Sequence, residues 1–392
     1  MTKPSSDDPF VDHRSMGAAG SDPLDVGAAE PTEQVKSATQ AHVGHLGRSA
    51  VGGEELLRVD DLSVEFPTDD GVVHAVRGVS YALHAGEVLG IVGESGSGKS
   101  VSSMAVMGLL PRSARISGDV SFRGEDVLSM PPAVQRSLRG RKIAMIFQDP
   151  MTAMNPVHTV GDQLAEAVLS HELMPRKKAL ARAEEALGMV GIPQPKTRLR
   201  NYPHEFSGGM RQRAMIAMAI INDPDVIIAD EPTTALDVTV QAQILEKLVE
   251  VKDAIGAAIV LITHDLGVVA GMTHRVLVMY AGRAVEVGET DDIFYRTRMP
   301  YTAGLLGSIP SLDSDDDGRL RPIHGTPPSL IHLPAGCPFS PRCPLATDLC
   351  RQTEPELFDT DVTGHVAACH HWRRLAEADD PTTFFRSESE AS

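Results

Sequence analysis

The stretch from Gly93 to Ser100, Gly-Glu-Ser-Gly-Ser-Gly-Lys-Ser, constrains the fold of this chain more than any other segment. It matches the pattern G-x-x-x-x-G-K-[ST] at every fixed position. A short apolar run over residues 87–93 leads into it, and a helical stretch follows. Glycines let the backbone wrap around phosphate groups, so that N–H groups and a helix N-terminus face the negative charge. The sequence therefore predicts a phosphate-binding loop between a buried strand and a helix.

This loop supplies the first predicted site residues. We expect Lys99 to reach the β- and γ-phosphates of a nucleotide and Ser100 to bind Mg²⁺. A flexible glycine turn is the alternative, and the flanking strand and helix argue against it. Taken alone, the motif indicates a P-loop NTPase, a class that includes kinases and GTPases. The residues predicted to bind nucleotide here are Gly93, Ser95, Gly96, Gly98, Lys99 and Ser100.

Further apolar runs over residues 226–229 and 258–262 repeat the buried-strand pattern, with a helical stretch at 238–254 between them. Alternating strands and helices are typical of a parallel α/β sheet. A β-rich segment begins at residues 56–66, and residues 161–190 have helical periodicity. The predicted fold is an α/β P-loop NTPase with a parallel core sheet of the RecA type.

Charge and hydropathy exclude several function classes. The chain has 36 basic and 53 acidic residues, which give a net charge of −17. Nucleic-acid binding needs a basic face, so this balance argues against it. No window approaches the roughly 18 apolar residues of a membrane span, and the first residues lack the apolar core of a signal peptide. We therefore expect a soluble cytoplasmic protein whose membrane partners, if any, are separate subunits.

Two downstream blocks narrow the class of NTPase. Residues 206–213 read Phe-Ser-Gly-Gly-Met-Arg-Gln-Arg, and residues 226–232 read Val-Ile-Ile-Ala-Asp-Glu-Pro. Here the sequence resembles the ABC ATPases: the first block is similar to their signature motif and the second to their Walker B strand with its adjoining glutamate. Gln148, Asp237 and His264 match the Q-loop, the D-loop and the switch histidine. The resemblance covers roughly residues 56–290.

The resemblance implies a role for each matching residue. Asp230 would hold Mg²⁺ together with Ser100 and Gln148, and Glu231 would act as general base toward the attacking water, assisted by His264 and Gln148. Adenine would stack on Phe66, with Tyr81 as the alternative ring. Ser207 and Gly209 would serve the nucleotide bound by a second ATPase subunit, and Gly208 and Asp237 are also predicted to bind nucleotide.

Residues 147–156 and 203–213, together with Gly-Cys-Pro-Phe-Ser-Pro-Arg-Cys-Pro at 336–344, resemble the bacterial oligopeptide and dipeptide importers. Within these the chain is similar to the first of two non-identical ATPase subunits. The resemblance implies two membrane permeases, a second ATPase and an extracytoplasmic peptide-binding protein. It places the chain at the cytoplasmic face of the membrane. Import of nickel or another small solute, or a soluble non-transport ABC ATPase, are the alternatives.

All four cysteines, Cys337, Cys343, Cys350 and Cys369, lie in the last fifth of the chain. Their spacing does not match a zinc ribbon. Four thiolates suit tetrahedral zinc or a 4Fe-4S cluster, and reduced structural thiols are a third interpretation. The family resemblance favours the cluster. His365, His370 and His371 surround the last cysteine; they could substitute as ligands but are more simply surface histidines.

The domain organisation predicted from these patterns has four parts. Residues 1–54 and 377–392 are expected to be disordered tails, because they contain few large apolar residues. An ABC ATPase domain spans 55–309, with an antiparallel β subdomain and a helical subdomain at about 150–220. A cysteine-rich C-terminal module spans 310–376, beginning with a charged linker.

Overall fold

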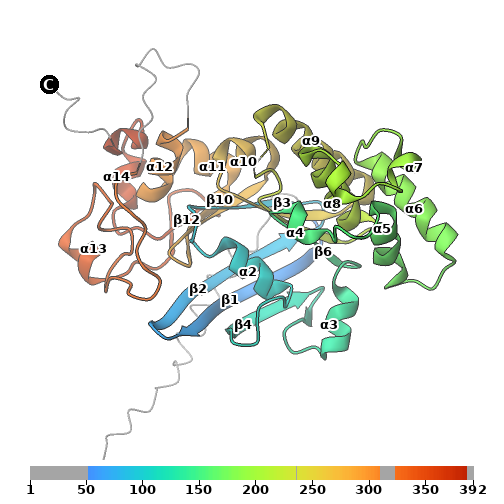
Figure 1. The fold of residues 1–392 in the computed structure, drawn as a ribbon. Coiled ribbons are helices and arrows are strands. Elements are labelled where there is room, and N and C mark those ends of the chain that lie inside the picture. Colours follow the sequence, from blue (N-terminus) through green and yellow to red (C-terminus); the bar gives the residue numbers. More distant parts are fainter. Residues whose placement is uncertain (1–51, 235, 310–322, 386–392) are drawn as a thin grey trace, which may run out of the picture. The chain divides into compact units, whose positions relative to one another are not determined.

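The computed structural model describes residues 52–234, 236–309 and 323–385. Nearly all of the expected N-terminal tail and the charged linker near residue 310 therefore lie outside the described residues. The described part contains two sheets, flanked by helices (Figure 1). Within these ranges no helix is both long enough and apolar enough to cross a membrane.

The larger sheet has eight strands in the order β11-β12-β10-β9-β3-β8-β7-β6. Its strands β9, β3, β8, β7 and β6 are parallel, while β10, β12 and β11 continue it in antiparallel fashion. The central strands are buried along their whole length, as the apolar runs predicted. The bounds are β3 Val88–Val92, β6 Ile143–Ile146, β7 Val226–Asp230, β8 Ala258–Thr263, β9 Arg275–Tyr280, β10 Arg283–Glu289, β11 Phe358–Asp359 and β12 Val366–Ala367.

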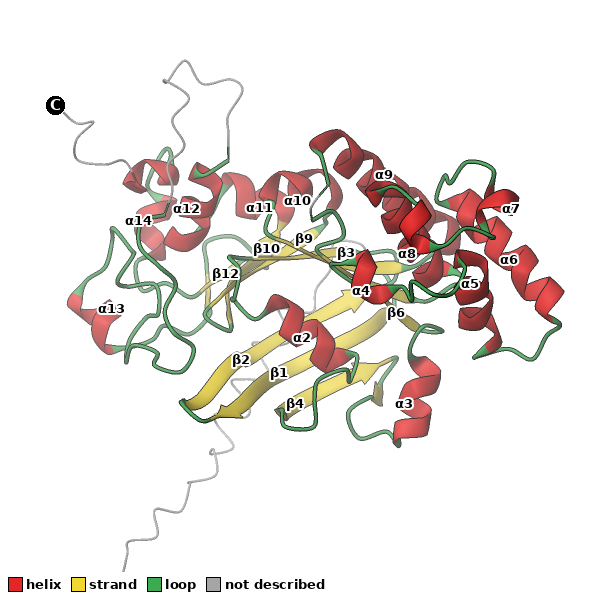
Figure 2. Ribbon diagram, viewed as in Figure 1, coloured by secondary structure: helices red, strands yellow, loops and turns green. Residues whose placement is uncertain are grey.

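The smaller sheet is antiparallel, with the order β2-β1-β4-β5. Helix α2 (Lys99–Val106) follows the phosphate-binding loop and contacts β1 and β2 of this sheet as well as β7 of the larger one (Figure 2). The two sheets thus share the apolar cluster that contains Leu57, Val79 and Ile91. The bounds are β1 Glu55–Thr68, β2 Gly71–His84, β4 Arg115–Phe122 and β5 Glu125–Asp126, with helix α3 at Pro132–Leu138. The P-loop NTPase fold predicted from the sequence is confirmed by this arrangement.

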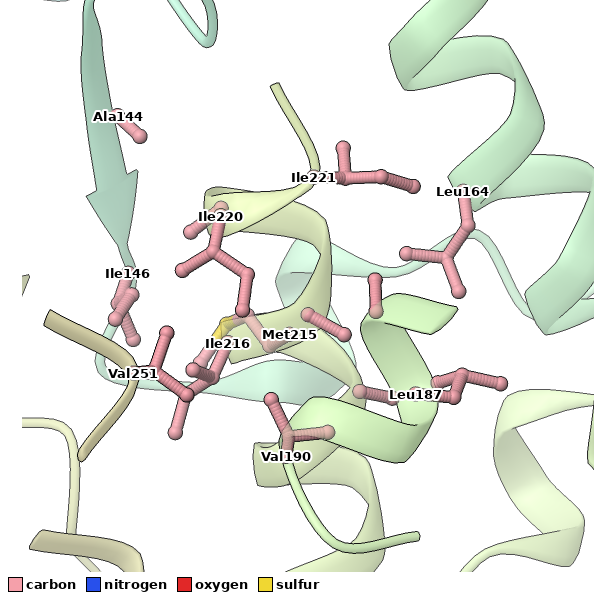
Figure 3. Packing of buried hydrophobic residues seen from close by; sticks show 14 of the residues in the cluster. Ala144, Ile146, Leu164, Leu187, Val190, Met215, Ile216, Ile220, Ile221 and Val251 are labelled. Carbon is pink, nitrogen blue, oxygen red and sulfur yellow. The ribbon is translucent and has the colours of Figure 1, made fainter. Parts of the chain in front are cut away.

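A group of helices lies between β6 and β7 in the sequence. It comprises α4 Pro150–Ala153, α5 Val160–Leu169, α6 Arg176–Met189, α7 Pro195–Arg198, the 3₁₀ turn η1 Pro203–Glu205 and α8 Gly208–Ile220. Figure 3 shows how α8 joins this group to the sheet: Ile216 and Ile220 face Ile146 of β6, while Leu187 of α6 and Leu164 of α5 close the cluster from the other side. The helical group is therefore held to the core by burial of α8.

The remaining helices cover the larger sheet or belong to the C-terminal segment. Helix α9 (Val238–Ile255) begins at Asp237, whose carboxylate accepts from the N–H of Val240, and ends at Gly256 with φ +72°. The others are α10 Leu266–Met272, α11 Thr290–Tyr295, α12 Pro300–Gly307, α13 Asp348–Gln352, α14 Trp372–Ala376 and the 3₁₀ turn η2 Pro381–Phe385.

One boundary differs from the sequence-based expectation. Residues 377–385, assigned above to a terminal tail, are described and include η2. Phe385 lies 6.5 Å from Phe339 between ring centroids, and it packs against the apolar cluster of Phe339 as well as the cluster of Leu345 and Leu375. The adjacent Phe384 and Phe385 provide apolar surface for packing, although the rest of this segment is polar.

Candidate functional site

The phosphate-binding loop lies at the carboxyl end of β3 and leads directly into α2. Two of its glycines are required by close backbone contacts. A Cβ at Gly93 would lie 2.2 Å from the carbonyl oxygen of Met279, and one at Gly98 would lie 2.3 Å from that of Ala75. Their φ values of +153° and +100° also favour glycine. The loop can therefore hold its curved shape only with glycine at these positions.

A cavity of about 550 Å³ opens over this loop. Its walls are residues 93–101 together with Gln148, Glu231 and His264, which follow β6, β7 and β8. These strands are parallel neighbours of β3, so their carboxyl ends meet at one edge of the sheet. The volume lies within the range of small-ligand sites, roughly 300–1,000 Å³. With Leu305 of the C-terminal part of the chain, five segments that are distant in sequence thus form one site.

Two carboxylates at the end of β7 have different partners. Asp230 accepts a hydrogen bond of 2.9 Å from the hydroxyl of Ser100. Glu231 accepts from Gln148 Nε2 and Thr234 Oγ1, both at 2.9 Å, and its other oxygen lies 3.3 Å from His264 Nδ1. Glu231 also has a φ of +45°, a conformation that side chains other than glycine rarely adopt. The surroundings therefore fix the position of this carboxylate.

Burial disfavours the charged forms of Lys99 and Asp230, although the two groups partly compensate each other. Burial lowers the pKa of Lys99, whose ammonium donates to the carbonyl oxygens of Gly93 and Glu94. Burial, with the nearby Glu231 charge, raises the pKa of Asp230 despite the hydrogen bond from Ser100. A polyphosphate beside Lys99 and a divalent cation beside Asp230 would each favour the charged form of its neighbour. The electrostatics of the site fit a magnesium–nucleotide complex.

The predicted signature residues lie outside this cavity. Ser207 caps α8, where its hydroxyl accepts from the N–H of Met210, and Gly208 and Gly209 form the first turn. A Cβ at Gly209 would lie 2.9 Å from Val240 of α9, the helix capped by Asp237. Ser207, Gly208, Gly209 and Asp237 are thus near one another, and none of them lines the phosphate cavity.

The structure separates the two candidate adenine-stacking rings. Tyr81 is 2% exposed inside the apolar cluster between the sheets, so it cannot meet a ligand. Phe66 is half-buried near the end of β1 and is not part of the cavity wall. Only Phe66 therefore remains accessible to a base.

Two residues outside the phosphate-binding loop that contact the site escaped the sequence analysis. Thr234 follows Glu231 by three residues and donates to its carboxylate. A hydroxyl so close in sequence to a predicted base could have indicated this contact. Leu305 of α12 reaches the cavity wall from the C-terminal part of the chain, and no local pattern marked it.

The four cysteines line one small pocket, although they come from residues 337–369. Burial raises the pKa of Cys337 to about 11 and that of Cys343 and Cys369 to about 12. The described residues contain no group of three or more His, Cys, Asp or Glu side chains arranged so as to hold a metal ion. The structure thus gathers the thiols around one pocket.

Of the three neighbouring histidines, His365 differs from the expectation of a surface residue. His365 is buried, and its Nε2 lies 2.9 Å from Glu286 Oε1. Each of these two buried polar groups therefore has a hydrogen-bond partner in the core. His371 lines the cysteine pocket with Nε2 2.9 Å from Thr347 Oγ1. His370 is bonded to the carbonyl oxygen of Thr353. His370 and His371 line the cysteine pocket, whereas His365 does not.

Comparison with protein families gives two matches. The ABC transporter family model matches residues 76–234, and the model for the oligopeptide/dipeptide transporter C-terminal region matches residues 285–350. The second match includes Cys337, Cys343 and Cys350.

Individual relatives agree with these matches. The chain is 56% identical over 315 residues to the oligopeptide transport ATP-binding protein OppD of Mycobacterium bovis, over 80% of this chain and 51% of that protein. It therefore spans about half the length of that relative. It is 54% identical over 304 residues to the dipeptide transport ATP-binding protein DppD of Bacillus subtilis, over 77% of this chain and 90% of that protein. A dimeric ATP-binding cassette solved in a post-hydrolysis state is similar in fold, with TM-score 0.54 and 24% identity over 60% of this chain and 99% of its own.

Proposed function

This chain belongs to the ABC transporter family, among the oligopeptide and dipeptide transport ATP-binding proteins, and on that premise we propose that it hydrolyses ATP to drive peptide uptake. The observation that carries the proposal is the position of Glu231. Its carboxylate borders the phosphate cavity and is held by Gln148, Thr234 and His264. A carboxylate fixed beside a phosphate loop suits a general base toward water.

We assign the ATP chemistry to the residues of the cavity. Lys99 and the N–H groups of the loop bind the phosphates, while Ser100, Asp230 and Gln148 hold Mg²⁺. Glu231 accepts a proton from the attacking water as ATP and water become ADP and phosphate. Phe66 stacks on adenine. Because Ser207, Gly208, Gly209 and Asp237 lie away from this cavity, we assign them to the nucleotide bound by a second ATPase subunit.

We propose that the chain functions at the cytoplasmic face of the membrane with two permease subunits, a second homologous ATPase and an extracytoplasmic peptide-binding protein. The support is the similarity to peptide transport ATP-binding proteins over 77–80% of the chain. A nickel or other small-solute importer and a non-transport ABC ATPase are the competing assignments.

The test is uptake in vesicles that contain the permeases and both ATPase subunits. We expect ATP-dependent uptake of a labelled tripeptide and none of nickel. Uptake of nickel alone would change the substrate class. A transport role would be contradicted if the two ATPase subunits copurified without the permeases and hydrolysed ATP independently of any membrane partner.

We propose further that the four thiols bind a structural 4Fe-4S cluster, with zinc as the alternative. The chemistry of four cysteines around one pocket supports it.

Iron, acid-labile sulfide and zinc content of protein purified without oxygen test this proposal. About four irons and four sulfides per chain would support the cluster. Stoichiometric zinc would mean that the thiols bind zinc instead of a cluster. If neither iron nor zinc is found, the cysteines are reduced thiols.

A further inference from the structure

Glu94 occupies a position of the phosphate-binding loop that the sequence motif leaves open. Its side chain is 26% exposed and belongs to the cavity wall. A carboxylate at this place repels the phosphates that the loop is built to bind. The loop therefore needs a compensating charge close to Glu94.

Arg342 of the C-terminal segment, residues 323–385, supplies that charge. Its two terminal nitrogens lie 2.6 and 2.8 Å from the two carboxylate oxygens of Glu94, across 248 residues of sequence. Such bidentate pairs fix orientation as well as charge. The Arg342 side chain is only 5% exposed, so the pair is shielded from solvent on the arginine side.

Further contacts hold Arg342 in place. Its Nε donates to the carbonyl oxygen of His324 over 3.1 Å, and Nη1 donates to the hydroxyl of Tyr280 over 3.2 Å. The guanidinium also lies 5.9 Å from the ring centroids of both Tyr280 and Phe339. The arginine is thus positioned before any nucleotide arrives.

A second contact reaches the backbone of the same loop residue. The N–H of Glu94 donates to the hydroxyl of Tyr301 over 2.8 Å. Tyr301 is fully buried and packs against Tyr280 and Phe339, with ring centroids 4.5 and 5.4 Å away. Both the side chain and the backbone of Glu94 are therefore held by residues beyond the core sheet.

We infer that Arg342 and Tyr301 are positioning residues for the phosphate-binding loop, and that the C-terminal segment is thereby required for tight nucleotide binding. This inference rests on the proposed ATP function. According to this inference, the C-terminal segment contributes directly to the nucleotide site. Because Arg342 immediately precedes Cys343, disruption of the cysteine pocket should also weaken nucleotide binding.

The test compares the affinity of full-length variants for Mg²⁺·ADP by calorimetric titration. Arg342→Met leaves Glu94 uncompensated, and we expect affinity to fall at least about tenfold. The matched control is Arg77→Met, because Arg77 makes a bidentate pair with Glu354 of the same segment and does not line the cavity. We expect this control to bind within about twofold of wild type; Glu354 keeps Arg283 as a partner at 3.3 Å.

The double variant Glu94→Gln/Arg342→Met separates charge compensation from general damage. It removes the repelling carboxylate, so we expect it to recover most of the lost affinity. If Arg342→Met does not fold, Arg342→Lys keeps the charge without the two-pronged geometry and should bind about threefold more weakly than wild type.

Wild-type affinity in Arg342→Met or Arg342→Lys would overturn the inference, as would an equal loss in Arg77→Met. A double variant as weak as the single one would overturn charge compensation. A wild-type chain that binds neither Mg²⁺·ADP nor Mg²⁺·ATP would instead overturn the proposed function itself.

Discussion

Gln148 Nε2 donates to Glu231 Oε2 over 2.9 Å and so joins the ends of neighbouring strands β6 and β7 across 83 residues. Gln148 also lies in the short connection from β6 to the helical group 150–220. A displacement of that group can therefore reach the proposed base through a single side chain. This contact is a physical route by which a partner bound to the helices would influence hydrolysis.

Replacing Glu231 with glutamine should abolish turnover but keep binding. The amide preserves the shape and most contacts with Gln148, Thr234 and His264 but cannot accept a proton. We expect kcat in the assembled complex to fall about 10²–10⁴-fold, with Mg²⁺·ATP still bound. Glu250→Gln, an exposed change on α9, is the control. Wild-type turnover in Glu231→Gln would remove Glu231 from the role of base.

Lys99→Met should weaken nucleotide binding without weakening the fold. Burial already disfavours the charged ammonium, so its removal relieves a cost in the empty protein. We expect an unfolding free energy within about 1 kcal/mol of wild type or above it. Thermal melts with and without Mg²⁺·ADP measure both effects, because the ligand-dependent rise in Tm should disappear. A full ligand-dependent rise would contradict the role given to Lys99.

Ser207→Ala should separate binding from turnover. Loss of the α8 cap costs about 1 kcal/mol of stability. Since Ser207 lies outside the phosphate cavity, the isolated chain should bind Mg²⁺·ADP as wild type does. The assembled complex should lose most of its ATPase activity.

Thr159→Ala is the matched control for Ser207→Ala, because Thr159 caps α5 through the N–H of Asp162. It should lose similar stability and keep its activity. Equal loss of ATPase in both variants would show that Ser207 acts through stability alone.

Ile216→Ala should weaken the attachment of the helical group to the sheet. Ile216 is fully buried in the cluster of Figure 3. Truncation there costs about 2–5 kcal/mol through lost burial and the cavity left behind. Urea unfolding measures the change, and Leu173→Ala, at a fully exposed position, should stay within about 0.5 kcal/mol. A negligible change for Ile216→Ala would mean that α8 does not anchor the group.

Much of the fold and the centre of the site could be predicted from local patterns. The apolar runs before Gly93 and through Ala229 became β3 and β7, because a strand buried on both faces must be apolar throughout. Residues 161–190 were less well predicted: they form two helices, α5 and α6, separated by the turn before Pro175. The choice between Phe66 and Tyr81 depended on burial, which local patterns do not report.

The sequence by itself determined the loop around Lys99, the adjacent Asp230 and Glu231, and the family. Each of these depends on short motifs of consecutive residues with fixed spacing. Only the tertiary structure decided which distant residues meet. It brought Arg342 to Glu94, paired His365 with Glu286 in the core and gathered four separated cysteines around one pocket. The physical reason is that such contacts depend on how helices and sheets pack over long loops, and packing is a property of the whole chain.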